Sequence, residues 1–221
     1  MKRILPVLLI AALCLCSCSD AWDILYKGRM FGTMQSAGVM LGDDGCTYHF
    51  TNMSQWGEEV PVSGRIVALF DVYKHIEGTE KDYEAKLLSF APPLCKEPVE
   101  CEDDEEQEAL GDDSIKILDG FWSGGHLNLT CSVMLRPTFA DQHHINLQIV
   151  SGESADTLHT ILRHNAGEDP YSDDDSESFV DYSFYASFPL ANKVSETGAK
   201  FLELRWQWDD EWQVVYADLR K

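Results

Sequence analysis

Positive charge is scarce in this sequence. Lysine and arginine together number 17, against 38 aspartates and glutamates, so the formal net charge is −21 at pH 7. A surface of that sign repels phosphate backbones, which excludes nucleic acid as a partner. It also disfavours docking on anionic lipid by charge alone. Acidity otherwise favours solubility and does not by itself identify a partner.

Catalytic motifs are missing as well. The chain has no G-x-S-x-G, no H-E-x-x-H, no Walker loop and no C-x-x-C. Three glycines occur between Gly120 and Gly125, but they lack the strand–helix context of a phosphate cradle and predict a turn. We therefore expect neither an enzyme nor a bound cofactor.

No apolar run is long enough to cross a bilayer as a helix, which takes about 20 residues. The run Ile4–Leu15 follows the basic start Met1–Arg3, a pattern typical of a secretory signal peptide. It ends in Leu15-Cys16-Ser17-Cys18. This resembles the lipobox of bacterial lipoproteins, in which a leucine and a small residue precede the cysteine that is acylated. The alternative is an ordinary signal peptide whose cysteines occur by chance.

The lipobox reading predicts a signal peptide at residues 1–17, an acylated Cys18 and a lipidated tether at 18–26. Several acyl chains on one cysteine anchor a protein stably, whereas a single chain binds only marginally. We therefore expect a protein of the cell envelope that is held at the membrane by its lipid anchor. The outer membrane is the expected location, with either the periplasmic or the surface face open.

Four cysteines remain after cleavage and acylation, namely Cys46, Cys95, Cys101 and Cys131. Export permits disulfides, and four cysteines allow three connectivities, between which the sequence does not choose. A zinc site would favour closer pairs than Cys95 and Cys101, so no metal is expected. Cys131 lies on an apolar strand face and could also be a plain core residue.

Short β-rich runs fill residues 27–96 and are separated by turns. Clear examples are Cys46–Thr51, Arg65–Tyr73 and Tyr83–Phe90. About five such strands in about 65 residues predict a small closed barrel. Acidic residues then crowd the segment 97–113, which predicts a solvated linker because such a run cannot form a core. A calcium site is disfavoured there, since the EF-hand spacing is absent.

Residues 114–221 show apolar alternation with a period of two. One strand face is Leu127, Leu129, Cys131, Val133 and Leu135. Similar faces recur at 145–149, 158–163, 180–188 and 202–208, and a hairpin turn at 209–211 leads into a last strand. About seven strands in about 105 residues predict an antiparallel β-sandwich. The fold class is therefore all-β, with a barrel followed by a sandwich.

Three weaker candidates for chemistry lie in this second half. His126 and His144 begin what look like adjacent strands, although both are expected to point outward. The loop 169–177 is acidic and is expected to be solvated, with weak calcium binding as the alternative. Trp206 and Trp208 share a face with leucines and predict core positions, whereas exposure would favour stacking on sugar rings.

Several segments together resemble a known family. They are Asp43-Asp44-Gly45 before a strand, Gly64–Val67, Gly124–Leu129, His144–Leu147, Ser187–Leu190 and a terminal hairpin at 201–219. With the lipobox, this pattern is similar to the NigD-like lipoproteins. The resemblance implies an N-terminal OB domain and a C-terminal β-sandwich. It also implies a link to bacteriocin immunity, and it supplies no catalytic residues.

Two functions of different kinds follow. The first is a binding lipoprotein of the immunity type, which intercepts a toxic protein or peptide at the envelope. An acidic surface suits a cationic partner of that kind. The second is a structural or accessory module of a surface assembly that is associated with glycans.

The anchor hypothesis is tested by changing Cys18→Ala, with Cys16→Ala as the matched control. Without the acylated cysteine the precursor should stay unprocessed or be released in soluble form, because the lipid anchor is lost. Cys16→Ala should remain processed and membrane-bound. Mass spectrometry of the N-terminal peptide reads out both variants, and an unmodified mature N-terminus in the wild type would refute the anchor.

Overall fold

The computed structural model describes residues 24–220, apart from the side chains of Asp173 and Asp174. The predicted signal peptide at 1–17 and the acylated Cys18 lie outside the described residues. Only residues 24–26 of the predicted tether are described, and Tyr26 already begins the first strand. Within residues 24–220, no helix is both long and apolar enough to cross a membrane.

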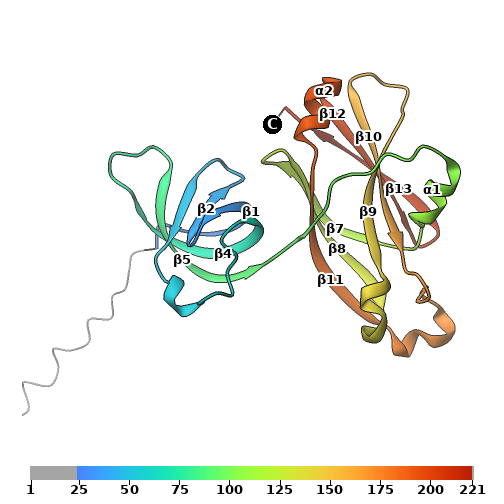
Figure 1. Ribbon diagram of the computed structural model, residues 1–221, viewed down its shortest axis with the longest axis horizontal. Helices are drawn as coiled ribbons and strands as arrows, with labels where there is room; N and C mark the ends of the chain where they lie inside the picture. Colours follow the sequence, from blue (N-terminus) through green and yellow to red (C-terminus); the bar gives the residue numbers. More distant parts are fainter. Residues whose placement is uncertain (1–23, 221) are drawn as a thin grey trace, which may run out of the picture.

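The first domain is a closed barrel of five strands, as the sequence predicted (Figure 1). The strands follow one another around the barrel in the order β1-β2-β3-β5-β4. Neighbours are antiparallel except β3 and β5, which run parallel. The bounds are Tyr26–Ser36 (β1), Val39–Gly42 (β2), Thr47–Phe50 (β3), Gly64–His75 (β4) and Asp82–Ala91 (β5), with a short 3-10 turn at Met53–Gln55 (η1).

Aromatic rings fill the barrel. Tyr48 and Phe70 are fully buried, and their ring centroids lie 4.6 Å apart. The hydroxyl of Tyr48 donates to Asp44 over 2.6 Å, which satisfies the one polar atom that this ring carries inward. Gly28 is required beside this stack, because a Cβ there would lie 2.5 Å from the Phe70 ring.

The second domain is a β-sandwich of two four-stranded sheets, in the orders β6-β11-β8-β7 and β13-β12-β10-β9. The bounds are Leu94–Cys95 (β6), Lys116–Ser123 (β7), His126–Leu135 (β8), His144–Val150 (β9), Thr157–Asn165 (β10), Val180–Pro189 (β11), Phe201–Trp208 (β12) and Glu211–Asp218 (β13). Short 3-10 turns occur at Pro137–Gln142 (η2) and Asp173–Ser178 (η3).

The sandwich departs from the predicted antiparallel pattern at two pairs. β10 and β12 run parallel, and so do β6 and β11. The chain leaves the second sheet after β10, forms β11 in the first sheet and returns through the helix α2 (Ala191–Thr197). This crossover brings β12 back in the same direction as β10, as a parallel pair requires.

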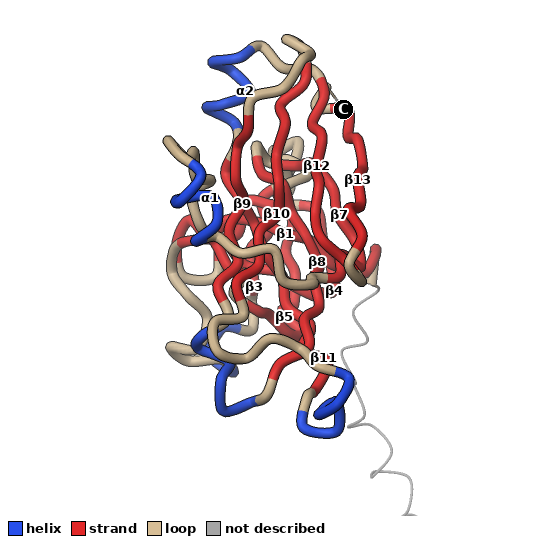
Figure 2. The backbone as a smooth tube through the Cα atoms, turned by 90° about the vertical axis from the view of Figure 1, so that its right-hand side faces the viewer, coloured by secondary structure: helices blue, strands red, loops and turns tan. Residues whose placement is uncertain are grey.

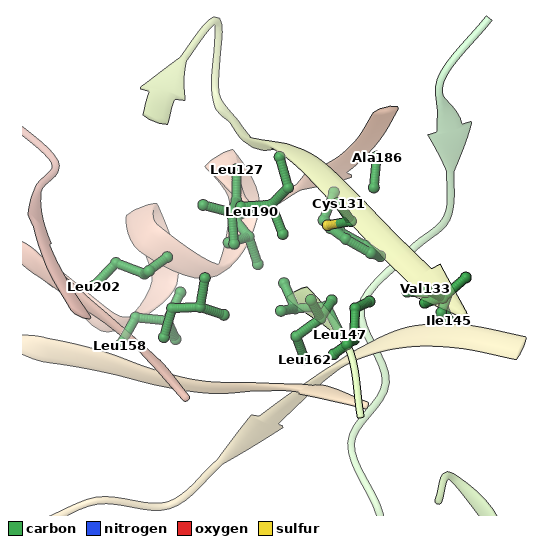
Figure 3. Close-up of a cluster of buried hydrophobic side chains, with 14 of the residues drawn as sticks. Leu127, Cys131, Val133, Ile145, Leu147, Leu158, Leu162, Ala186, Leu190 and Leu202 are labelled. Atoms are coloured by element: carbon green, nitrogen blue, oxygen red, sulfur yellow. The ribbon is translucent and has the colours of Figure 1, made fainter. Parts of the chain in front are cut away.

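The core lies between the two sheets and uses the period-two faces read from the sequence (Figure 3). Leu129, Cys131, Leu147 and Phe188 are completely buried in it. Trp206 packs against this core but is only partly buried, so its predicted core position is confirmed in part.

The acidic segment 97–113, which we call the strap, is attached to the sandwich at Val99 and Asp112, whereas most of its acidic side chains are exposed. Val99 adds to the free edge of β9, since its N–H donates to Leu147 O and its carbonyl accepts from Ile149 N, each over 2.8 Å. The short helix α1 (Asp104–Ala109) follows, and Figures 1 and 2 show it beside the sheet that contains β9 and β10. Asp112 then pairs with Arg163 of β10.

The prediction of a solvated linker did not include this attachment, because it counted the acidic residues without the cation that Asp112 meets. Arg163 is only 7% exposed and lies on the outer face of its sheet, where it also donates to Gln148 over 2.8 Å. A buried guanidinium needs a carboxylate, and Asp112 supplies it. The two domains are therefore joined at Pro92-Pro93, immediately after β5, and the sandwich begins at Leu94.

Candidate functional site

A buried polar cluster joins the two domains. Asp43 lies in the turn after β2. Arg65 of β4 donates from its two terminal guanidinium nitrogens to the two carboxylate oxygens of Asp43, over 2.6 and 2.8 Å. From the sandwich, Ser123 donates to Asp43 over 2.7 Å, and Asn128 accepts from Arg65 over 2.9 Å. Ser187 donates to Asn128 over 2.8 Å. We call these five residues the joint cluster.

The joint cluster is enclosed. The side chains of Arg65 and Asp43 are only 6% and 8% exposed, and Asn128 is fully buried. Removing one partner of such a pair leaves an uncompensated charge, which typically costs about 3–5 kcal/mol. Gly124 is also part of the fit, because a Cβ there would lie 2.5 Å from Asp43 Oδ1. The glycines at 124 and 125 thus form a turn, as predicted, and one that lets Asp43 approach.

Aromatic contacts surround this cluster. Phe31 of the barrel meets Phe121 and Tyr185 of the sandwich edge-to-face, with centroids 5.6 and 5.8 Å apart. Arg29 donates to the hydroxyl of Tyr185. The barrel therefore covers the end of the outer face of the β7–β8–β11 sheet that carries Asn128 and Tyr185, which explains why Asn128 is buried although it alternates with the core residues of β8.

A second buried network lies at the far end of the sandwich. His143 and His164 stack with their centroids 5.1 Å apart, and His143 Nδ1 lies 2.9 Å from His164 Nε2. His143 Nε2 lies 3.1 Å from Asp169, and His164 Nδ1 lies 2.9 Å from the carbonyl of Ser114. Arg136 donates to Asp169 from its backbone and its side chain.

The direction of each bond in this network follows from its acceptors. The Ser114 carbonyl can only accept, so His164 carries its proton on Nδ1. Burial lowers the pKa of His164, which keeps this ring neutral and leaves Nε2 to accept from His143. His143 Nδ1 then donates to His164, and the other ring nitrogen, Nε2, faces the Asp169 carboxylate. Burial alone would raise the pKa of Asp169, but hydrogen bonds from Arg136 and His143 hold it below its usual value.

A cavity of about 600 Å³ opens beside His164. Its lining combines carboxylates with large apolar side chains: Asp112, Asp113, Asp209 and Asp210 with Met134, Tyr171 and Trp208. Asp209 and Asp210 form the β12–β13 turn with φ of 53° and 59°, a backbone that Asp tolerates, and both are exposed. We call this the acidic pocket. Its chemistry suits a positively charged group with an apolar stem.

Several candidates from the sequence do not come together. His126 and His144 lie in different sheets, so they do not meet, and His126 instead bonds the carbonyl of Gly124 over 2.8 Å. The loop 169–177 is not simply solvated, because Asp169 is fully buried and paired. Among residues 24–220, no group of three or more histidine, cysteine or acidic side chains is arranged to hold a metal.

None of the disulfides that the sequence permits is formed, and the four cysteines of the described chain are free thiols. Cys46 belongs to the barrel, whereas Cys95, Cys101 and Cys131 belong to the sandwich domain. Cys131 is a fully buried core residue, and burial raises the pKa of its thiol to about 12. Of the two interpretations of Cys131, a disulfide partner or a plain core residue, the structure agrees with the second.

The residues of both networks went unrecognised in the sequence because they are far apart along the chain. Asp43 and Arg65 were read as a turn and a strand start, and Asn128 as the polar face of a strand. The sequence gives no local signal for Asn128, because only the structure shows that β8 is buried on both faces over this stretch. A polar residue in such a strand needs partners.

Fold and site together define a two-domain β protein, in which a closed barrel is fixed to the outer face of a sandwich. The chain belongs to the NigD-like family, since the model of the NigD-like C-terminal beta sandwich domain matches residues 97–214. That match begins within the strap, in agreement with its attachment to the sandwich. No curated protein matches the chain.

Solved structures share the whole two-domain fold. A protein of unknown function from Bacteroides vulgatus is 15% identical with a TM-score of 0.68, covering 87% of this chain and 90% of its own. A protein described as a NigD-like immunity protein, from Bacteroides caccae, is 14% identical with a TM-score of 0.58, covering 87% and 92%. A protein described as a lipoprotein, from Bacteroides fragilis, is 11% identical with a TM-score of 0.56, covering 88% and 97%.

The lowered pKa of His164 makes stability depend on pH. Below the usual value of 6.5 the unfolded chain gains a proton there that the folded chain does not, so stability falls as pH falls through 6.5. One proton gives a slope of at most about 1.4 kcal/mol per pH unit. In denaturant titrations from neutral to mildly acidic pH, His164→Gln should show a flatter slope than the wild type. The exposed control His144→Gln should keep the wild-type slope, and an unchanged slope in His164→Gln would contradict the account.

Proposed function

We propose that the chain is a lipid-anchored binding protein of the cell envelope, of the immunity type, whose partner is a basic protein or peptide. The observation that carries this proposal is the acidic pocket, a cavity of about 600 Å³ with apolar walls and four carboxylates. Asp112 is already paired with Arg163 and Asp113 accepts from Ala166 N, so the exposed Asp209 and Asp210 are the carboxylates offered to a partner. Arginine and lysine side chains match it, since they carry a charged head on an apolar stem. The formal charge of −21 would speed the encounter with such a partner.

Binding rather than catalysis fits the way the buried polar groups are used. In the joint cluster, Ser123 and Ser187 donate to Asp43 and Asn128 rather than to a histidine base. In the second network, Asp169 is hydrogen-bonded to both His143 and Arg136. A nucleophile needs a base within hydrogen-bond reach, and neither network pairs one with the other.

The relatives support the same proposal at a coarse level. One structural neighbour is described as an immunity protein and another as a lipoprotein. For this chain, we infer an anchor on Cys18 and a place at the outer membrane, which leaves both domains free to meet a partner near the membrane surface.

A second candidate function is an accessory role with glycans. The observation that favours it is the exposure of Trp212 and Tyr216, which are 52% and 63% exposed on β13. Aromatic faces of this kind can stack on sugar rings. The two functions differ in what the chain captures, and this can be measured.

The proposed function predicts capture of a basic polypeptide from envelope extracts, strong at low salt and weak at high salt. Asp209→Asn with Asp210→Asn should reduce capture several-fold, because the pocket loses two carboxylates while asparagine keeps the left-handed turn. Asp104→Asn with Glu105→Gln removes the same charge from α1, outside the pocket, and should leave capture unchanged.

Pull-down followed by mass spectrometry reads out this test. Capture that is independent of salt and unchanged in the pocket variant would contradict the electrostatic proposal. The absence of any captured polypeptide would contradict it as well. Captured material that resists protease but yields to glycosidases would favour the accessory role instead.

A further inference from the structure

The two lateral sides of the sandwich differ in whether their sheet edges are paired with further chain. On one side the chain covers part of each sheet edge: β6 pairs with Ala186 and Ser187 of β11, and Val99 pairs with Gln148 of β9. Lys96 crosses between them and donates to the carbonyl of Ile145 over 3.1 Å. On the other side, β7 and β13 are the last strands of their sheets, and within residues 24–220 no further strand pairs with either. Figure 2 shows β13 at the outer margin, next to β12.

The backbone of β13 offers a defined set of unpaired groups. Trp208 and Glu211 face each other across the two-residue turn, so they exchange backbone hydrogen bonds. Bonding to β12 then alternates along the strand. The N–H and C=O groups of Trp212, Val214 and Tyr216 therefore point away from β12, toward the free edge.

The same three residues carry exposed apolar side chains. Trp212, Val214 and Tyr216 are 52%, 53% and 63% exposed and share one face of the strand, and Val215 on the other face is 47% exposed. Side chains of the neighbouring strands β12 and β10 hold the rings of Tyr216 and Trp212 in position. The hydroxyl of Tyr216 donates to the buried Glu203 over 2.8 Å, and the guanidinium carbon of Arg163 lies 5.9 Å from the Trp212 ring centroid.

Sheet edges are normally protected against pairing with other chains. Charged residues in the middle of the strand, prolines or bulges serve this purpose. The interior of β13, from Trp212 to Ala217, contains no charge and no proline, and its register with β12 shows no bulge. An apolar, regular and exposed edge of this kind is a template for the addition of another strand.

Charge indicates which strand the edge would accept. Asp209, Asp210 and Glu211 stand at one end of β13, and the first two of them line the acidic pocket. A second copy of this chain would bring the same charges and a formal −21 toward its own kind, which opposes self-pairing. A basic segment meets complementary charge instead.

We propose that β13 is a docking edge that pairs with an extended, basic segment of the partner protein. Backbone bonds to Trp212, Val214 and Tyr216 would hold the segment, its apolar side chains would pack on the exposed face, and a basic side chain would reach the acidic pocket. This inference rests on the proposed function and deepens it, because it assigns the surface and the conformation of the bound partner.

The test uses the purified full chain and a labelled peptide of alternating lysine and valine, matched to β13 at 8 residues. Fluorescence anisotropy should show saturable binding. Val214→Lys should weaken it about tenfold or more, because it places a like charge at the centre of the edge. The matched control is Val62→Lys, at a barrel position that is 61% exposed, and it should bind as the wild type does. Equal melting temperatures confirm that both variants are folded.

Four results would overturn the assignment. Three of them are the absence of saturable binding, equal weakening by both lysine variants, and equal binding of a glutamate–valine peptide. A wild-type dimer in sedimentation that Val214→Lys dissociates would also overturn it, since the edge would then pair copies of this chain. Failure of the proposed function is separable. If the chain captures an envelope partner and Val214→Lys captures it equally, only the edge assignment fails. If the peptide binds at β13 but no envelope partner is captured, only the proposed function fails.

Discussion

A single buried ion pair, Asp43 with Arg65, sets the arrangement of the two domains. Both residues belong to the barrel, yet their remaining hydrogen-bonding capacity is met by Ser123 and Asn128 of the sandwich. Separating the domains would expose this pair to water but would also strip it of those partners. Losing one member of a buried pair typically costs about 3–5 kcal/mol, a large part of the roughly 5–15 kcal/mol that stabilises a domain. The ion pair thus acts as a fixed joint rather than as a surface contact.

The rest of the surface follows from where this joint lies. The barrel covers part of the outer face of the β7–β8–β11 sheet. The strap pairs with β9 and contacts Arg163 on the opposite sheet. The surfaces left open include the pocket end of the sandwich and the edges of β7 and β13. The proposed partner is therefore directed to surfaces that neither the barrel nor the strap covers, and of these the pocket and the β13 edge share the acidic turn at Asp209 and Asp210.

Much of the fold could be predicted, because alternation with a period of two is a local signal. It correctly indicated the barrel strands, the faces of β8 and β12, and the β12–β13 hairpin. Contacts between distant segments left no local trace. The attachment of the strap was not predicted because Arg163, which neutralises Asp112, is 51 residues away. The histidines that meet are His143 and His164, and not the pair that strand positions suggested, because β8 and β9 belong to different sheets. The parallel β10–β12 pair depends on a crossover through β11 and α2, which the strand pattern does not encode.

The central claim is that the Asp43–Arg65 pair holds both domains in one orientation, and ¹⁵N relaxation of the barrel and sandwich amides tests it most directly. The account predicts one common correlation time for both domains in the wild type. In Arg65→Ala, Asp43 loses its cation, and the two domains should tumble with separate, shorter correlation times. Arg29→Ala removes an exposed contact across the same interface and should leave the common value unchanged. A common and unaltered correlation time in Arg65→Ala would contradict the account.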